Sequence, residues 1–260
     1  MTASPPPPEV SPRLPSEKPT QIILSSESIA RLPEFKLEVV ATSKDTIGKV
    51  ISLCYQKKFN EASKAMDSLF KKYKNHPAYW NQVGTCFFLQ GNMRGALLYY
   101  NKALSLNKNY APPINNLGVI YERDGREQKA LLAFKKASEL NSFSLTPIFN
   151  LSQMYLKYGF TDKARSLLAA LYKKNSKDVD VVNSLAVSYM IEGNHQEALK
   201  WYDKIPRELH SRYDIGINYA LTLKLGGRPS DAKVIFERIN VTKLGDSSAY
   251  YGKVKRFLEL

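Results

Sequence analysis

The sequence predicts an all-α solenoid of six 34-residue helix–turn–helix repeats, closed by a C-terminal capping helix. Three kinds of residue recur at a fixed interval of 34 residues, and one interval shared by independent columns indicates an internal repeat. The columns hold an alanine (Ala62, Ala96, Ala130, Ala164, Ala198 and Ala232), a glycine (Gly91, Gly125, Gly159, Gly193 and Gly227) and an aromatic residue (Phe87, Tyr121, Tyr155 and Tyr189).

Each recurring position has a physical role within its repeat. Leu117 and Tyr121 lie four residues apart and therefore share one face of a first helix. Gly118 lies between them and allows a second helix to approach closely. Gly125 is placed where the first helix must end, because glycine adopts a left-handed backbone without strain. Ala130 then lies where the second helix crosses the first.

The repeats are expected to fill residues 43–246. They begin near Ser43, Pro77, Ala111, Leu145, Val179 and Tyr213. The first copy departs from the pattern with Lys57 in the glycine column, and the last copy has Gly216 where a bulky residue is usual. Such departures are common in terminal repeats, because one of their sides faces water. Residues 247–260 carry apolar residues at helical spacing and are expected to form the cap.

The repeating pattern resembles the tetratricopeptide repeat family. The family pattern is W-x2-LG-x2-Y followed by A-x3-F-x2-A. The second copy matches it with Trp80, Val83, Gly84, Phe87, Ala96, Tyr100 and Ala103. The resemblance covers about residues 43–246 and implies a superhelix whose first helices line a concave face.

This concave face is the predicted binding site for a protein partner. The resemblance places an amide at the sixth position of four repeats, similar to an asparagine ladder that bonds to the backbone of an extended peptide. An amide suits this role because it both donates and accepts hydrogen bonds; bonding inside its own repeat is the alternative. The expected partner-binding residues are the amides Gln82, Asn116, Asn150 and Asn218 and, beside them, Phe88, Arg123, Phe149, Val187 and Met190.

The sequence shows no converging groups of the kind that catalysis requires. His76, His195 and His210 lie near predicted turns without cysteines at metal-ligand spacing, which favours solvent-exposed turn histidines over a metal site. Neither common type of phosphate-binding glycine loop is present. We therefore expect a non-enzymatic scaffold with no catalytic residue, no metal and no cofactor.

The chain is basic, with 38 Lys and Arg against 24 Asp and Glu. Pairs such as Lys135-Lys136 and Lys173-Lys174 fall at the ends of second helices on the expected outer side, where they complement the helix dipole. The concave face is neither strongly basic nor clearly lined with stacking aromatics, which disfavours nucleic acid there. Nucleic-acid or anionic-surface binding through the outer face is the alternative from a different functional class.

Cys54 and Cys86 are the only cysteines, and both fall in helical pattern. A bridge between them and a pair of reduced, packed thiols are both compatible with the sequence. Because two cysteines are too few for a disulfide framework, reduced thiols are favoured.

The N-terminal tail, residues 1–42, is divided by its composition. Residues 1–20 are proline-rich and are expected to be a disordered spacer. Residues 21–40 are rich in apolar side chains, so part of them is expected to order on the array, either on the first repeat or along the groove.

A polar tether ahead of tetratricopeptide repeats also resembles outer-membrane lipoproteins of the pilus-assembly (pilotin) kind. Those proteins carry a lipidated cysteine at their mature start, so here the resemblance requires an anchor that has been removed ahead of Met1. It implies the bacterial cell envelope, with the cytoplasm as the alternative. No segment is apolar for long enough to span a membrane, and insertion is not expected without a lipid anchor.

Overall fold

A computed structural model describes residues 46–140, 145–244 and 247–260. Its described residues form helices joined by short turns and contain no strand, which confirms the predicted all-α solenoid. The predictions for the tail, including the ordering of residues 21–40, lie outside the described residues.

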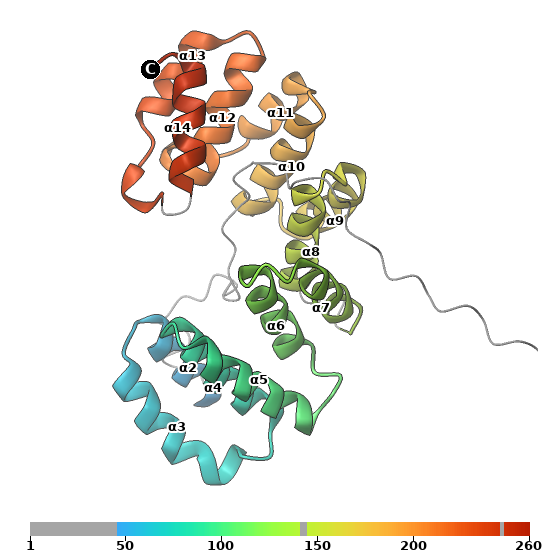
Figure 1. Cartoon of the computed structure of the whole chain (residues 1–260), viewed down its shortest axis with the longest axis vertical. Coiled ribbons are helices and arrows are strands. Elements are labelled where there is room, and N and C mark those ends of the chain that lie inside the picture. Colours follow the sequence, from blue (N-terminus) through green and yellow to red (C-terminus); the bar gives the residue numbers. More distant parts are fainter. Residues whose placement is uncertain (1–45, 141–144, 245–246) are drawn as a thin grey trace, which may run out of the picture.

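Six helix pairs follow one another along the molecule, from α2 and α3 at one end to α12 and α13 at the other (Figure 1). The first helices are α2 (Thr46–Tyr55), α4 (Pro77–Leu89), α6 (Ala111–Arg123), α8 (Leu145–Lys157), α10 (Val179–Ile191) and α12 (Tyr213–Leu225). The second helices are α3 (Phe59–Tyr73), α5 (Met93–Leu106), α7 (Glu127–Leu140), α9 (Thr161–Lys174), α11 (His195–Tyr202) and α13 (Pro229–Glu237). These pairs fit the predicted number of repeats.

Three further elements complete the C-terminal end. They are the short 3-10 helices η1 (Arg207–Ser211) and η2 (Val241–Lys243) and the last helix, α14 (Ser248–Leu258). Helix α14 packs against α12 and α13 and buries Val254 and Leu258. It therefore covers the apolar side that the last pair would otherwise expose.

The glycine column ends the first helices as its spacing predicts. The five glycines have positive φ angles between 70° and 83°. Lys57 takes the same left-handed conformation in the first pair, with φ 59°. A residue with a Cβ atom is strained in this conformation, so Lys57 lowers the stability of the first turn, whereas the glycines avoid this strain in the other turns.

The small-residue columns allow the helices of a pair to approach closely. A Cβ atom on Gly118 would lie 2.7 Å from the ring of Phe134, and one on Gly84 would lie 2.7 Å from the ring of Tyr100. Both rings are buried, with Tyr100 fully so. The aromatic residue of each second helix therefore occupies the space left by the missing side chain on the first.

Cys54 and Cys86 form a disulfide between α2 and α4, so the expectation of two reduced thiols was wrong. The first helices of neighbouring pairs lie side by side, and this packing brings the last turn of α2 against the last turn of α4. The two Cα atoms are 5.4 Å apart, a distance that suits a bridge. The disulfide fastens the terminal repeat, which has no preceding repeat to pack against.

The second helix of the fifth pair is much shorter than those of the second, third and fourth pairs. Helix α11 has 8 residues, whereas α5, α7 and α9 have 14 each. Pro206 is the counterpart of Tyr172, which lies inside α9 and 206 − 172 = 34 residues earlier. A proline inside a helix removes a backbone donor and clashes with the preceding turn, so α11 ends early and the chain continues into η1.

This change of path buries His210, which corrects the expectation that all three histidines are solvent-exposed. The His210 ring lies 3.0 Å from the carbonyl oxygen of Ile205 and packs edge-on against Tyr219, with centroids 4.9 Å apart. Burial lowers the pKa of His210. His195 is half-buried, and only His76 is exposed, where its Nδ1 accepts from the backbone nitrogen of Ala78 at 3.3 Å.

Candidate protein-interaction surfaces

A chain of asparagine amides connects three neighbouring first helices. Asn150 of α8 donates to Oδ1 of Asn115 at 2.9 Å, and Asn115 donates to Oδ1 of Asn116 at 3.2 Å on α6. Asn116 in turn donates to Oδ1 of Asn81 on α4 at 3.2 Å. All four residues are buried. The amides thus bond across repeats, which differs from the alternative of bonding inside each residue's own repeat. The ladder to a partner's backbone stays a prediction.

Asn115 and Asn81 were absent from the predicted site, yet they join two of its members. They stand at the fifth repeat position, directly before the sixth-position column. In the chain described above Asn115 both donates and accepts, whereas Asn81 only accepts.

Asn218 is placed apart from the other amides. It is 0% exposed, donates to the carbonyl oxygen of Asp214 at 3.4 Å, and accepts from the hydroxyl of Tyr250 on α14 at 3.1 Å. In the intervening repeat the sixth position is Ser184, which bonds to Gln153 of α8. The structure therefore brings Asn116 and Asn150 into one network and places Asn218 under the capping helix.

The apolar residues predicted for the site are all buried. Phe149 and Val187 are 0% and 1% exposed and belong to the core between helices. Met190 is buried as well. Phe88 is 5% exposed and lies beneath the guanidinium of Arg123, 4.4 Å from its ring centroid, which is a cation–π contact between α4 and α6.

Arg123 and Gln82 are the predicted residues that solvent reaches most readily. Arg123 is exposed at the end of α6, and Gln82 is half-buried on α4. Arg123 contacts the buried Phe88 ring, and Gln82 lies six residues before Phe88 on α4; we call these three residues the inner patch.

Ion pairs between repeats flank the inner patch and hold neighbouring helices in register. Lys157 of α8 contacts Glu122 at 3.2 Å and Glu127 at 2.7 Å. Burial alone would lower the Lys157 pKa, but its bonds to the two carboxylates outweigh burial and raise it. Further along, Arg212 contacts Asp180 at 2.7 Å and the buried Asp214 at 2.6 Å. Lys157 and Arg212 are both charged and paired with carboxylates of a neighbouring repeat, so they link adjacent repeats.

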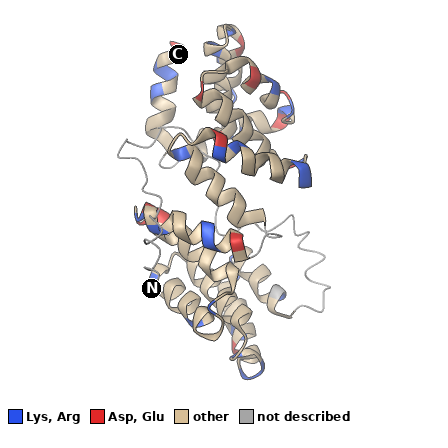
Figure 2. Cartoon of the chain, turned by 90° about the vertical axis from the view of Figure 1, so that its right-hand side faces the viewer, with Lys and Arg blue, Asp and Glu red and all other residues tan. Residues whose placement is uncertain are grey.

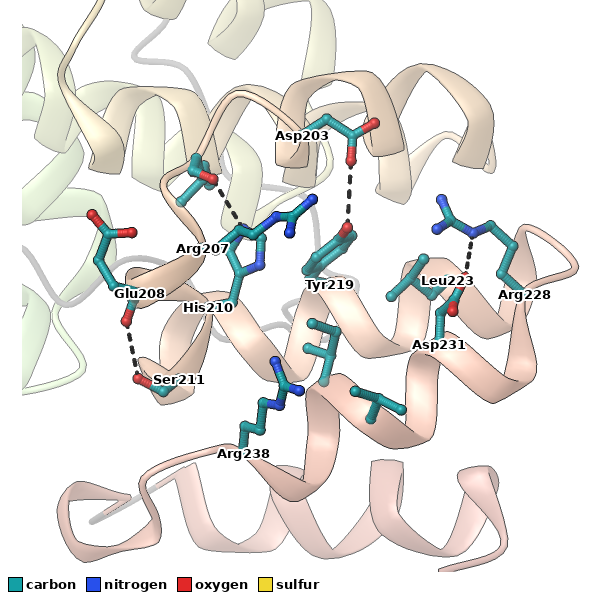
Figure 3. Close-up of a pocket in the computed structure, with 13 residues that line it drawn as sticks. Asp203, Arg207, Glu208, His210, Ser211, Tyr219, Leu223, Arg228, Asp231 and Arg238 are labelled. Atoms are coloured by element: carbon teal, nitrogen blue, oxygen red, sulfur yellow. Dashed lines mark hydrogen bonds and ion pairs between the residues drawn. The ribbon is translucent and has the colours of Figure 1, made fainter.

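A cavity of about 710 Å³ lies on another side of the array, between the end of α11 and η1 on one side and α12 and α13 on the other (Figure 3). Buried Tyr219 and Leu223 of α12 contribute apolar surface, as does Ile205. Charged residues surround this apolar part, and none of them had been predicted as a site residue. Pro206, which shortens α11, is the residue from which the cavity could have been predicted in the sequence.

Basic residues are spread over the molecule together with acidic ones. In the view of Figure 2, Lys and Arg are distributed along several helices and alternate with Asp and Glu. No group of three or more His, Cys, Asp or Glu residues among those that the structure describes could hold a metal ion. None of the helices in the described ranges combines the length and apolarity needed to cross a membrane.

Comparison with known proteins agrees with the repeat architecture. Two family models, both described as tetratricopeptide repeat, match residues 116–239 and 48–111. The chain belongs to the tetratricopeptide repeat family, and this fold supports a protein-interaction scaffold. No curated protein matches the chain in sequence.

Solved structures resemble this chain in fold at low sequence identity. A chain from the Cut9–Hcn1 hetero-tetramer of the APC/C aligns with TM-score 0.68 and 15% identity over 86% of this chain, which spans 45% of that chain. PilW, a type IV pilus biogenesis factor, aligns with TM-score 0.64 and 15% identity, covering 83% of this chain and 97% of PilW. YrrB, a tetratricopeptide protein with an unusual peptide-binding site, aligns with TM-score 0.56 and 17% identity, covering 75% and 98%.

Proposed function

We propose that this protein is a non-catalytic scaffold that binds an extended segment of a protein partner along its first helices. The partner contacts the inner patch, in which Arg123 and Gln82 are accessible to solvent. The observation that carries the proposal is the exposed guanidinium of Arg123 stacked on Phe88, with the half-buried Gln82 six residues before Phe88 on α4. The guanidinium supplies charge and the Gln82 amide supplies backbone-bonding capacity to an extended chain.

The buried amide chain gives the inner patch a rigid foundation. Asn81, Asn115, Asn116 and Asn150 connect α4, α6 and α8, so the residues above them are held at fixed spacing. A preorganised surface loses less conformational freedom on binding, which increases affinity. YrrB, which has a related fold, has a peptide-binding site, and this is consistent with the proposal.

A random library of 16-residue peptides displayed on phage provides the test. Peptides selected on the full chain are measured by fluorescence anisotropy against Gln82→Ala/Arg123→Glu. Lys135→Glu serves as the matched charge control, because Lys135 is exposed on the second helix α7. We expect selected peptides that lose at least about tenfold in affinity on the patch variant and keep it on the control. Peptides indifferent to the patch variant would contradict the proposal.

We also propose a narrower role, in which the scaffold works in the bacterial cell envelope and helps to assemble a pilus or secretion machine. The disulfide between Cys54 and Cys86 supports it, because disulfides persist in oxidising compartments and are rare in the cytosol. The similarity in fold to PilW, a pilus biogenesis factor, is consistent with the same location.

The genomic sequence upstream of Met1 tests this second proposal. A signal peptide ending in a lipidated cysteine, followed by fractionation of the protein with the outer membrane, is the expected result. Fractionation of the native protein with the cytosol would exclude it, and it would leave the scaffold proposal in place.

A further inference from the structure

The cavity of about 710 Å³ occupies the space that the missing end of α11 leaves. Helix α11 is 14 − 8 = 6 residues shorter than α9, which corresponds to about 9 Å of helix at the usual rise. Here the chain turns at Pro206 into η1, which contacts both α12 and α13.

The floor of the cavity is apolar and buried, and one exposed apolar side chain lies beside it. Leu223 and Tyr219 of α12 form its base with Ile205, and each is less than one-tenth exposed. Val234 of α13 also lines the cavity and is 46% exposed. An apolar side chain entering here would cover Val234 and be removed from water itself.

Some charged residues around the cavity have hydrogen-bond or ion-pair partners, and others have no ion-pair partner. Arg228 pairs with Asp231 at 2.7 Å, and Asp203 accepts from the hydroxyl of Tyr219 at 3.4 Å. Among the residues that the structure describes, Arg207 and Arg238 have no carboxylate within ion-pair distance. Figure 3 shows them reaching toward the cavity from opposite sides, Arg207 from η1 and Arg238 from the end of α13.

Glu208 is the remaining carboxylate of the lining, and it does not neutralise these two arginines. Its carboxylate points away from Arg238 in Figure 3, while its backbone oxygen accepts from the Ser211 hydroxyl at 3.2 Å. The cavity therefore combines an apolar floor with two arginines that are available to an incoming anionic group.

We propose that this cavity is a second docking site, which takes a short, acidic, amphipathic helical segment of a protein partner. About two turns of helix fill the gap left by α11, an apolar face covers Val234, and carboxylates on its flanks meet Arg207 and Arg238. Charge complementarity favours carboxylates, and the length of the gap favours a helical turn over an extended chain. The site is separate from the inner patch and does not depend on it.

The same phage library tests this proposal with a different pair of variants. Peptides are selected on the Gln82→Ala/Arg123→Glu protein, in which the inner patch is altered, and measured against Arg207→Glu/Arg238→Glu and against Val234→Trp, which fills the cavity. Lys135→Glu/Lys136→Glu on α7 is the matched double charge reversal. Circular dichroism confirms that each variant is folded.

We expect selected peptides to place Leu or Phe at helical spacing beside Glu or Asp, and to lose at least about tenfold in affinity on both cavity variants. The control variant should bind them as before. Selection of no peptide, or of peptides indifferent to both cavity variants, overturns the proposal. A synthetic peptide of residues 21–42 is measured in the same way. If it binds and its binding is lost on both cavity variants, the occupant is the chain's own tail, and the proposal of a partner is overturned.

Discussion

Reduction of the disulfide between Cys54 and Cys86 should loosen the first helix pair and leave the rest of the array intact. The two cysteines are 32 residues apart, and closing a loop of this length lowers the entropy of the unfolded chain by the equivalent of about 4 kcal/mol. In a repeat array each unit contacts only its neighbours, so this stabilisation acts on α2, α3 and α4. The opening of α2 and α3 should become about a thousandfold more favourable on reduction.

Hydrogen exchange followed by mass spectrometry measures this effect directly. Peptides from α2 and α3 should exchange faster in the Cys54→Ala/Cys86→Ala protein, while peptides from α10 and α12 should exchange as in the unaltered protein. Labelling the denatured protein with an alkylating reagent, without reductant, should modify neither cysteine. Two modified cysteines, or equal exchange of α2 in both proteins, would refute the reasoning.

Three further predictions follow from single positions. Lys57→Gly should stabilise the protein by about 0.5–1 kcal/mol in urea unfolding, because Lys57 has φ 59°; a lower midpoint would contradict the strain argument. Asn115→Ala should cost about 2 kcal/mol, because it removes two buried amide bonds, whereas the exposed Asn101→Ala on α5 should cost much less. Stability should fall as the pH decreases through about 6.5, because burial lowers the pKa of His210 and the unfolded state then binds more protons; His210→Leu should remove this slope.

The architecture of the array was predictable because its determinants are local and repeated. Gly125 and its counterparts take the left-handed conformation, and Ala130 and its counterparts are fully buried at helix crossings. Both roles depend on neighbours within one repeat, and a fixed interval makes such neighbours visible in the sequence.

The contacts between repeats could not be read from the same columns. Cys54 and Cys86 occupy different positions within their repeats, and they meet only because α2 and α4 lie side by side. Asn150 likewise bonds to Asn115, 35 residues away, which moves the amide chain from the sixth position to the fifth. A search for identical positions misses pairs of this kind, because the offset between neighbouring helices is set by their packing.

Pro206 shows how one residue changes the outer surface of an otherwise regular array. It stands at the position where α9 continues through Tyr172, and its effect is to end α11, to bury His210 and to open the cavity beside α13. The core of the pair is kept, since Ala198 and Tyr202 are both 0% exposed. The first helices therefore keep their spacing, and the inner patch is held by the amide chain, while the outer side gains a separate cavity. Substitutions in the cavity should therefore weaken the binding of peptides that dock in the cavity and leave the binding of peptides to the inner patch unchanged.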